Sequence, residues 1–397
     1  MEMIASPPGR KPPGRAPGNP RMALPPEQWP AADRLAWDRA QKPGNPLNRP
    51  GAASTWRPAT RKSVAGAYGR WLAFLAARGA LDLQAEVGQP AAHHITAARM
   101  YDYVEHLLTS CSTGTAANYL ALLVMMGQAL APKTDWQWLQ ELQKQLQCGA
   151  LPVRDKRRRI VPSGELLRLG LELMATAQAR TAAAGISRHT AQDFRDGLMI
   201  ALLASRPLRQ KNFVAMEIGQ HLLPMGEGYR ISFAAHETKT RRALDFAFPD
   251  RLLPALRQYL KIYRPFLLAL RATRGQSRSA LLPLAGNALW VTQYGTRFGA
   301  NAQTKALKKH TVARFDKFVN PHLFRDCVAS SIANEDPEHV RITAQILGHE
   351  RLDTTEKYYI QAQSSVATQR YHDRILSIRA DGKKRDRHDK AGRQADQ

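Results

Sequence analysis

The stretch that most constrains the fold of this chain runs from His322 to Tyr358. It opens next to Pro321, and proline is favoured at the first position of a helix, so a helix is predicted to begin there. His322 and Arg325 are three residues apart and therefore share one face of that helix. A second amphipathic helix, with Asp336 as its N-cap, is predicted before the stretch ends. Histidine, arginine and tyrosine side chains are thus carried on a helical framework.

These residue types suit attack on a phosphodiester. A tyrosine hydroxyl is a poor nucleophile at its free pKa of about 10, so it needs help to lose its proton. Arginine binds two phosphate oxygens at once and stabilises the charge that grows on them. Histidine can hold the phosphate, or exchange protons with the tyrosine and the leaving group. If two arginines stabilise the charge, neither a metal ion nor another cofactor is expected.

The spacing of these residues resembles the second conserved box of the tyrosine recombinase, or phage integrase, family. The family pattern is H-x-x-R, then L-G-H, then T-T-x-x-Y, with the tyrosine nine residues after the histidine. This chain reads HLFR and later LGHERLDTTEKY, in which Tyr358 follows His349 by nine residues. The spacing favours Tyr358 over Tyr359 as the nucleophile. Because both pieces occur at the family spacing, the alternative of a helical core with chance histidines is disfavoured.

The resemblance also assigns a first catalytic arginine. The family places it in a turn after a helix, followed three residues later by a polar residue and then by an apolar run. Arg209 fits this pattern, with Asn212 as the polar residue. The usual glycine-rich approach is replaced by the sequence RPL, which leaves Arg206 as a weaker alternative.

A catalytic lysine is implied in the same way. Residues 228–248 alternate between apolar and polar side chains, which predicts a β-hairpin or meander. The family carries its lysine on such a hairpin, commonly within a T-K-T string, so Lys239 is the expected general acid. One departure from the family is Asp326, where many members have a second histidine. The catalytic set implied by the resemblance is Arg209, Lys239, His322, Arg325, His349 and Tyr358.

Composition supports a polyanionic partner. Lysine and arginine total 58 against 33 acidic residues, a net charge of +25, which is most simply explained by nucleic acid binding. A generally basic proteome or basic tails would give the same sign of charge, and basic residues on a helix are often plain solvated charges. The candidate DNA contacts are Arg61, Lys62, Arg70, Lys156, Arg157, Arg158, Arg159, Arg241 and Arg242.

The chain divides by composition into five regions. Residues 1–52 hold 12 of the 25 prolines and are predicted to form a disordered Pro/Arg-rich extension, apart from a short helix around Trp37. Residues 53–148 show four helical stripes and resemble the helical core DNA-binding domain of the family, and a basic linker follows at 149–162. Residues 163–378 are expected to form a mixed α/β catalytic domain, and 379–397 a charged disordered tail. The predicted fold is mainly α with a small antiparallel β-sheet.

The implied partner is double-stranded DNA with paired recombination sites, bound by a homotetramer, with accessory DNA-bending proteins as further candidates. The resemblance also connects the chain with DNA integration and mobile genetic elements. Three cysteines without metal-ligand spacing fit a reduced setting. Neither a signal peptide nor an apolar run of roughly 18 residues is found, so no membrane partner is expected. These features predict a soluble, cytoplasmic and nucleoid-associated protein.

Two other functions stay open. A type IB topoisomerase-like enzyme would use a similar residue set to relax DNA without strand exchange, but the L-G-H box and the preceding helical block argue against it. A DNA-binding factor that has lost catalysis is the second alternative. No catalytic position is vacant, so the sequence does not indicate such a loss.

Overall fold

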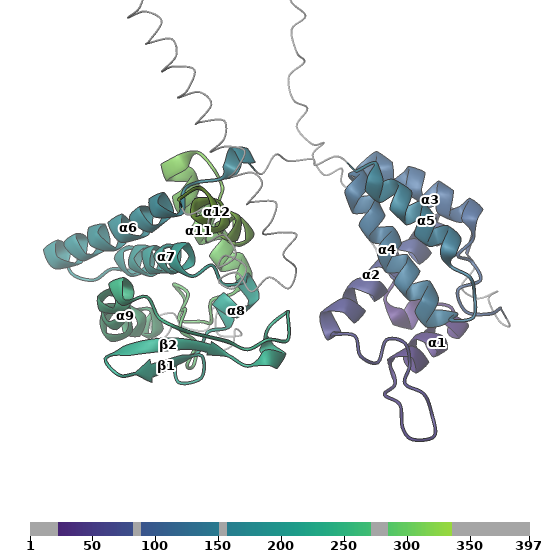
Figure 1. Ribbon diagram of the computed structural model, residues 1–397, viewed down its shortest axis with the longest axis horizontal. Coiled ribbons are helices and arrows are strands. Elements are labelled where there is room, and N and C mark those ends of the chain that lie inside the picture. Colours follow the sequence, from purple (N-terminus) through teal and green to yellow (C-terminus); the bar gives the residue numbers. More distant parts are fainter. Residues whose placement is uncertain (1–22, 82–88, 151–156, 271–284, 336–397) are drawn as a thin grey trace, which may run out of the picture. The chain divides into compact units, whose positions relative to one another are not determined.

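The computed structural model describes residues 23–81, 89–150, 157–270 and 285–335, drawn in colour in Figure 1. The chain forms two compact units, Met1–Arg154 and Asp155–Gln397, and each has a hydrophobic core of its own. The boundary between them falls within residues 149–162, the predicted linker. None of the helices in the described ranges combines the length and the apolar character needed to cross a bilayer.

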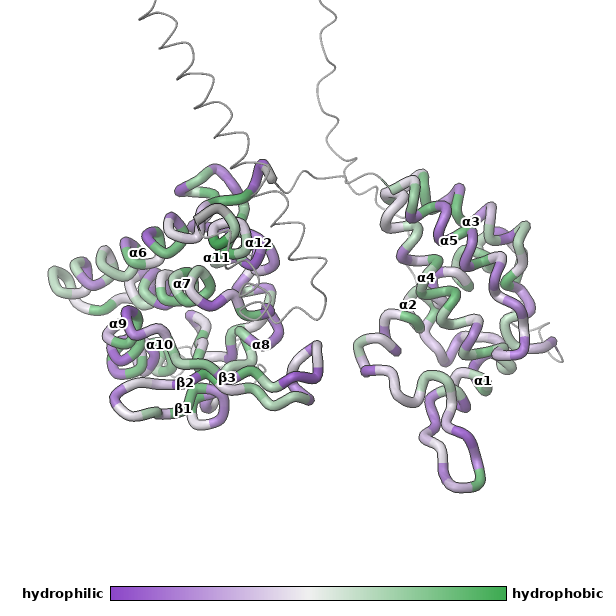
Figure 2. Tube along the Cα trace, in the orientation of Figure 1, coloured by the Kyte–Doolittle hydropathy of each residue, from purple (hydrophilic) through white to green (hydrophobic). Residues whose placement is uncertain are grey.

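The first unit is a helical bundle. Figure 2 shows hydrophobic and hydrophilic residues mixed along each of its helices, as expected when a helix buries only one face. The buried faces meet around Trp71, which is fully buried and packs edge-on against Tyr103 with 5.1 Å between ring centroids. The described helices are α1 (Ala31–Gln41), α2 (Pro58–Ala77), α3 (Ala97–Ser110), α4 (Thr113–Leu130) and α5 (Gln137–Cys148).

The disordered extension predicted for residues 1–52 is wrong for residues 23–52. Trp29 and Trp37 are each 4% exposed and belong to the core of the first unit, and α1 packs against α4. Asp33 on α1 accepts hydrogen bonds from Tyr68 Oη at 2.8 Å and from the backbone N–H of Ala92 at 2.7 Å. The short helix predicted around Trp37 is confirmed as α1. The prolines in the turns that flank it are compatible with a packed segment because they rigidify turns.

Two long helices form the centre of the second unit. α6 (Ser163–Ala184) and α7 (Arg188–Ser205) cross at Gly170 and Gly197, where an added Cβ would meet backbone atoms of the other helix at 2.6–2.7 Å. Only glycine permits this close approach. α7 begins at a capping box in which Ser187 Oγ accepts from the N–H of Thr190 and Thr190 Oγ1 accepts from the N–H of Ser187. Most residues of α7 are buried, so this helix is the axis of the core.

A three-stranded antiparallel sheet with strand order β1-β2-β3 follows α8 (Gln210–Ala215). The strands are β1 (Leu222–Met225), β2 (Gly228–Phe233) and β3 (Leu244–Ala247). The predicted meander over residues 228–248 is therefore confirmed as β2 and β3, and β1 is an additional strand. Ile231 pairs with Leu222 on one side and with Phe246 on the other, and its buried side chain fixes the register against the core.

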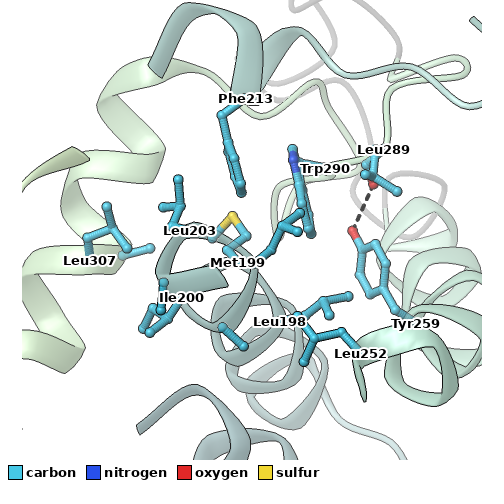
Figure 3. Close-up of a cluster of buried hydrophobic side chains, with 14 of the residues drawn as sticks. Leu198, Met199, Ile200, Leu203, Phe213, Leu252, Tyr259, Leu289, Trp290 and Leu307 are labelled. Carbon is cyan, nitrogen blue, oxygen red and sulfur yellow. Dashed lines mark hydrogen bonds between the residues drawn. The ribbon is translucent and has the colours of Figure 1, made fainter. Parts of the chain in front are cut away.

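The core of the second unit includes Leu208, which lies in the segment between α7 and α8. Figure 3 shows Met199 and Leu203 of α7 beside Phe213, whose ring stacks on Trp290 with 5.1 Å between centroids. Tyr259 Oη donates a 3.0 Å hydrogen bond to the carbonyl oxygen of Leu289, drawn dashed in Figure 3. The remaining helices are α9 (Leu253–Gln258), the π-turn η5 (Tyr259–Tyr263), α10 (Arg264–Ala269), α11 (Ala300–Phe315) and α12 (Pro321–Glu335). The predicted fold class, mainly α with a small antiparallel sheet, is confirmed.

Candidate active site

The loop between α7 and α8, residues 206–209, is where the elements that carry the candidate catalytic residues converge. Arg325 on α12 donates a hydrogen bond from Nη1 to the carbonyl oxygen of Pro207 at 2.5 Å. The guanidinium of Arg206 lies over the ring of Phe246 on β3, 5.9 Å from its centroid. Just after the loop, Gln210 Nε2 donates to Thr304 Oγ1 on α11 at 3.1 Å. Contacts from α12, β3 and α11 therefore hold the residues just before and just after Arg209.

Arg209 itself occupies the position before the first residue of α8, with an extended backbone (φ −62°, ψ 140°). Its side chain is half-buried. The preceding Leu208 is 5% exposed and belongs to the hydrophobic core, as does Phe213 one turn into α8. Two buried apolar side chains thus hold the backbone on either side of Arg209.

His322 and Arg325 lie in the first turns of α12, and the helix begins at Pro321 as predicted. The Asn320 side chain caps it, because Asn320 Oδ1 accepts the backbone N–H of Leu323 at 2.9 Å. His322 is exposed, whereas Arg325 is 9% exposed. The two side chains share one face of α12, but Arg325 reaches across to the carbonyl of Pro207 and is buried by that contact.

Lys239 lies in the connection between β2 and β3. The N–H of Arg241 donates to the carbonyl of Thr238 at 3.4 Å, which makes Lys239 a corner residue of a tight turn, and Arg241 has a left-handed φ of 52°. The Lys239 side chain is exposed. Thr238 is fully buried, and its Oγ1 donates to the carbonyl of Arg242 at 2.7 Å. The lysine side chain is therefore exposed, while the preceding Thr238 is buried and hydrogen-bonded within the turn.

A histidine–glutamate pair, His221 and Glu237, ties this turn to the start of β1. His221 Nε2 lies 2.9 Å from Glu237 Oε1, and Glu237 Oε2 accepts the backbone N–H of Ala234 at 2.8 Å. The hydrogen bond from His221 lowers the pKa of Glu237 below its usual value, so the carboxylate is charged at neutral pH. Sequence inspection missed both residues, since only the tertiary fold brings His221 to the sequence HETKTRR.

The two remaining catalytic candidates, His349 and Tyr358, lie outside the described residues, together with Tyr359. Four of the six candidates are therefore located in the fold. Pro207, which accepts the hydrogen bond from Arg325, is two residues before Arg209. Phe246 of β3, the strand that follows the Lys239 turn, contacts Arg206 of the same loop.

The candidate DNA contacts fall into two groups. In the first group the guanidinium already contacts protein: Arg61 donates to the carbonyls of Ala53 and Ser54, Arg70 to Tyr119 Oη, and Arg159 to the carbonyl of Phe318. The second group comprises Lys62, Arg158, Arg241 and Arg242, whose side chains are exposed at the surface, as is that of Arg70. Lys156 and the side chain of Arg157 lie outside the described residues.

A buried ionic cluster joins α7 to α11. Arg195 donates from Nε and Nη2 to Asp196 Oδ1, and His310 Nε2 lies 3.2 Å from Asp196 Oδ2. Burial alone would raise the pKa of Asp196, but the positive charge of Arg195 and the hydrogen bond to His310 outweigh it, and the pKa is lowered. Within the described residues, no group of three His, Cys, Asp or Glu side chains is placed to hold a metal ion.

Comparison with known proteins identifies a family model and solved structures of similar fold. The model of the phage integrase family matches residues 172–365. Two crystal structures of the XerH site-specific recombinase, a post-cleavage complex with palindromic difH substrate and a pre-cleavage complex with difH substrate, have the same fold, each with a TM-score of 0.50 at 14% identity. The superpositions cover 87% of this chain and 98% and 97% of the XerH chains. None of the curated protein sequences matches this chain.

Proposed function

Residues 172–365 make this chain a member of the phage integrase family of tyrosine recombinases, and we propose that it cuts and rejoins DNA at specific sites through a 3′-phosphotyrosyl intermediate. The observation that carries the proposal is the hydrogen bond from Arg325 to the carbonyl of Pro207. It joins the helix that bears His322 and Arg325 to the loop that bears Arg209, and in the proposed site both arginines bind one phosphate.

The proposed reaction is a transesterification. Tyr358 Oη bonds to the DNA phosphorus as His322 assists removal of its proton, and the bond from phosphorus to the 5′ oxygen breaks. Lys239 gives a proton to that departing oxygen, while Arg209 and Arg325 stabilise the five-coordinate phosphate and His349 hydrogen-bonds to it. A 5′ hydroxyl of a partner duplex then reverses the step. Because the phosphotyrosine retains the energy of the broken bond, rejoining uses no ATP.

The two compact units are proposed to have separate roles in this reaction. We assign DNA binding to the helical first unit, including residues 23–52, and catalysis to the unit that follows the linker, in place of the predicted boundaries of 53–148 and 163–378. Exchange of strands between paired sites requires two duplexes and four cleavages, so the active assembly we propose is a homotetramer on DNA, aided by accessory DNA-bending proteins. Such an enzyme would act on chromosomal and mobile-element DNA in the cytoplasm.

The test is recovery of DNA that stays attached to the protein after denaturing lysis of cells that express it. Wild type is expected to carry DNA joined through 3′ ends, and sequencing that DNA identifies the site. Tyr358→Phe is expected to carry none, because the hydroxyl that forms the bond is missing, whereas the matched control Tyr359→Phe retains the adduct. Loss of the adduct in Tyr359→Phe alone would assign the nucleophile to Tyr359.

A second measurement separates recombination from relaxation. Two linear duplexes that contain the recovered site are incubated with wild-type protein, and exchanged products of new length are expected. If supercoiled DNA is relaxed but no exchanged product forms, the activity is that of a type IB topoisomerase. If neither occurs and no adduct is recovered, the chain is a DNA-binding factor.

A further inference from the structure

We propose that His221 and Glu237 are positioning residues that hold the Lys239 turn in the orientation needed to protonate the departing 5′ oxygen. This inference rests on the proposed function, in which Lys239 is the general acid. It concerns two side chains that lie outside the motifs of the sequence and that the described fold brings into contact.

The histidine is fixed by the core. His221 directly precedes β1, is 4% exposed, and its ring lies 4.6 Å from the ring of the buried Phe233. Its Nδ1 accepts the backbone N–H of Glu217 at 3.1 Å, and the carbonyl of His221 accepts the N–H of Ser232 at 2.9 Å. Because Nδ1 is an acceptor, Nε2 carries the proton of the ring and donates it toward Glu237.

The glutamate transmits this rigidity to the turn. Glu237 Oε1 receives the Nε2–H of His221 at 2.9 Å, and Oε2 receives the N–H of Ala234 at 2.8 Å, so both carboxylate oxygens are engaged. Glu237 is two residues from Lys239, and the intervening Thr238 is fully buried. The connection between β2 and β3 is thereby clamped from β1 on one side and by the buried threonine on the other.

Such a clamp matters because Lys239 is exposed and its side chain is long and flexible. An exposed turn without an anchor would present its ammonium group in many directions. General acid catalysis requires the donor within hydrogen-bond reach of the leaving oxygen, and a misplacement of about 1 Å can lower the rate about 100-fold. The His221–Glu237 pair reduces that freedom without touching the DNA itself.

The test uses the full-length protein and a duplex that carries the site recovered from cells. Cleavage is measured on the ordinary duplex and on one in which sulfur replaces the bridging 5′ oxygen. A thiol has a pKa of about 8.5, against about 15.7 for water, so the thiolate leaves without a proton donor. Glu237→Ala is expected to cleave the ordinary duplex about 10- to 100-fold more slowly than wild type, and the sulfur duplex at the wild-type rate. Glu237→Gln retains an acceptor for His221, so its rate on the ordinary duplex is expected to lie between those of wild type and Glu237→Ala.

Matched variants make the outcomes distinct. His236→Gln changes the exposed neighbour of Glu237 and is expected to leave both rates unchanged, and the thermal midpoint of each variant shows that it is folded. Rescue of Lys239→Ala by the sulfur duplex would support Lys239 as the general acid. The positioning role would still be wrong if Glu237→Ala cleaved the ordinary duplex at the wild-type rate. It would also be wrong if Glu237→Ala cleaved the ordinary and the sulfur duplex more slowly by the same factor. If sulfur does not rescue Lys239→Ala, the general acid assigned in the proposed function is wrong.

Discussion

Arg325 Nη1 donates a 2.5 Å hydrogen bond to the carbonyl oxygen of Pro207, a residue 118 positions earlier in the chain. The contact fastens the start of α12 to the loop that ends in Arg209. It also keeps the Arg325 guanidinium largely buried, at 9% exposure. A backbone carbonyl, which no substitution at Pro207 would remove, is thus part of the framework of the site.

Arg325→Lys is expected to abolish most of the cleavage activity. Lysine keeps the charge but lacks the planar fork, so it cannot satisfy the Pro207 carbonyl and a phosphate together. We expect cleavage of the recovered site to fall by about 10²- to 10³-fold, measured as the rate of covalent adduct formation. The thermal midpoint is also expected to fall, since the buried hydrogen bond to the Pro207 carbonyl is lost. A variant with wild-type rates would remove Arg325 from the proposed site.

Arg209 and Arg206 should differ in their effects. The Arg206 guanidinium is already engaged with the ring of Phe246, whereas Arg209 occupies the position that the family pattern assigns to catalysis. We expect Arg209→Gln to lower adduct formation by about 10²-fold or more, and Arg206→Gln to lower it by less than tenfold. The reverse order in the same adduct assay would transfer the catalytic role to Arg206.

Trp37 should be essential for the stability of the first unit. Its side chain is 4% exposed in the core, so Trp37→Ala is expected to lower the free energy of unfolding by about 3–5 kcal/mol. Leu47, in the same segment, is 93% exposed, and Leu47→Ala should change that free energy by less than about 0.5 kcal/mol. Urea unfolding followed by tryptophan fluorescence compares the two. Equal effects would restore the view of residues 23–52 as an unpacked extension.

Lys62 and Arg61 are adjacent in sequence but should act differently. Arg61 donates to the carbonyls of Ala53 and Ser54, so Arg61→Gln is expected to destabilise the first unit by about 1–3 kcal/mol. Lys62 is exposed, and Lys62→Gln should keep stability but reduce the slope of log affinity against log salt by about 1, as one phosphate contact is lost. DNA titrations at several salt concentrations measure this slope. If the affinity of wild type for DNA did not change with salt, exposed basic side chains such as Lys62 would not bind DNA phosphates.

His94 should make the first unit sensitive to mild acid. Burial of its ring lowers its pKa from 6.5 to about 3, while the unfolded chain keeps the ordinary value. Below pH 6.5 the His94 ring binds a proton in the unfolded chain but not in the folded protein. The contribution of the neutral ring to the free energy of unfolding is therefore fully present above pH 6.5 and is lost as the pH falls toward 3. One proton gives a slope of about 1.4 kcal/mol per pH unit. His94→Gln should flatten the slope of unfolding free energy between pH 6 and pH 5, and an unchanged slope would contradict this origin.

Local features made much of the site predictable. The start of α12 was predictable because Pro321 acts within its own turn, and the strands β2 and β3 because their side chains alternate. The short helix around Trp37 was predicted and is α1, but its packing into the core was missed because prolines dominate its surroundings, although Trp29 and Trp37 are the kind of residues that a core needs. Strand β1 escaped notice because it has four residues, one of them Pro224.

The sequence by itself determined the residue types of the site, their order and the helices and turns that carry them, because these depend on neighbours a few positions apart. Only the tertiary structure decided which of them meet. The contacts between Arg325 and Pro207, between Arg206 and Phe246, and between His221 and Glu237 join segments that are distant in the chain or separated by a strand. Such contacts depend on how whole elements pack around α7, and no periodicity or spacing within one segment encodes them.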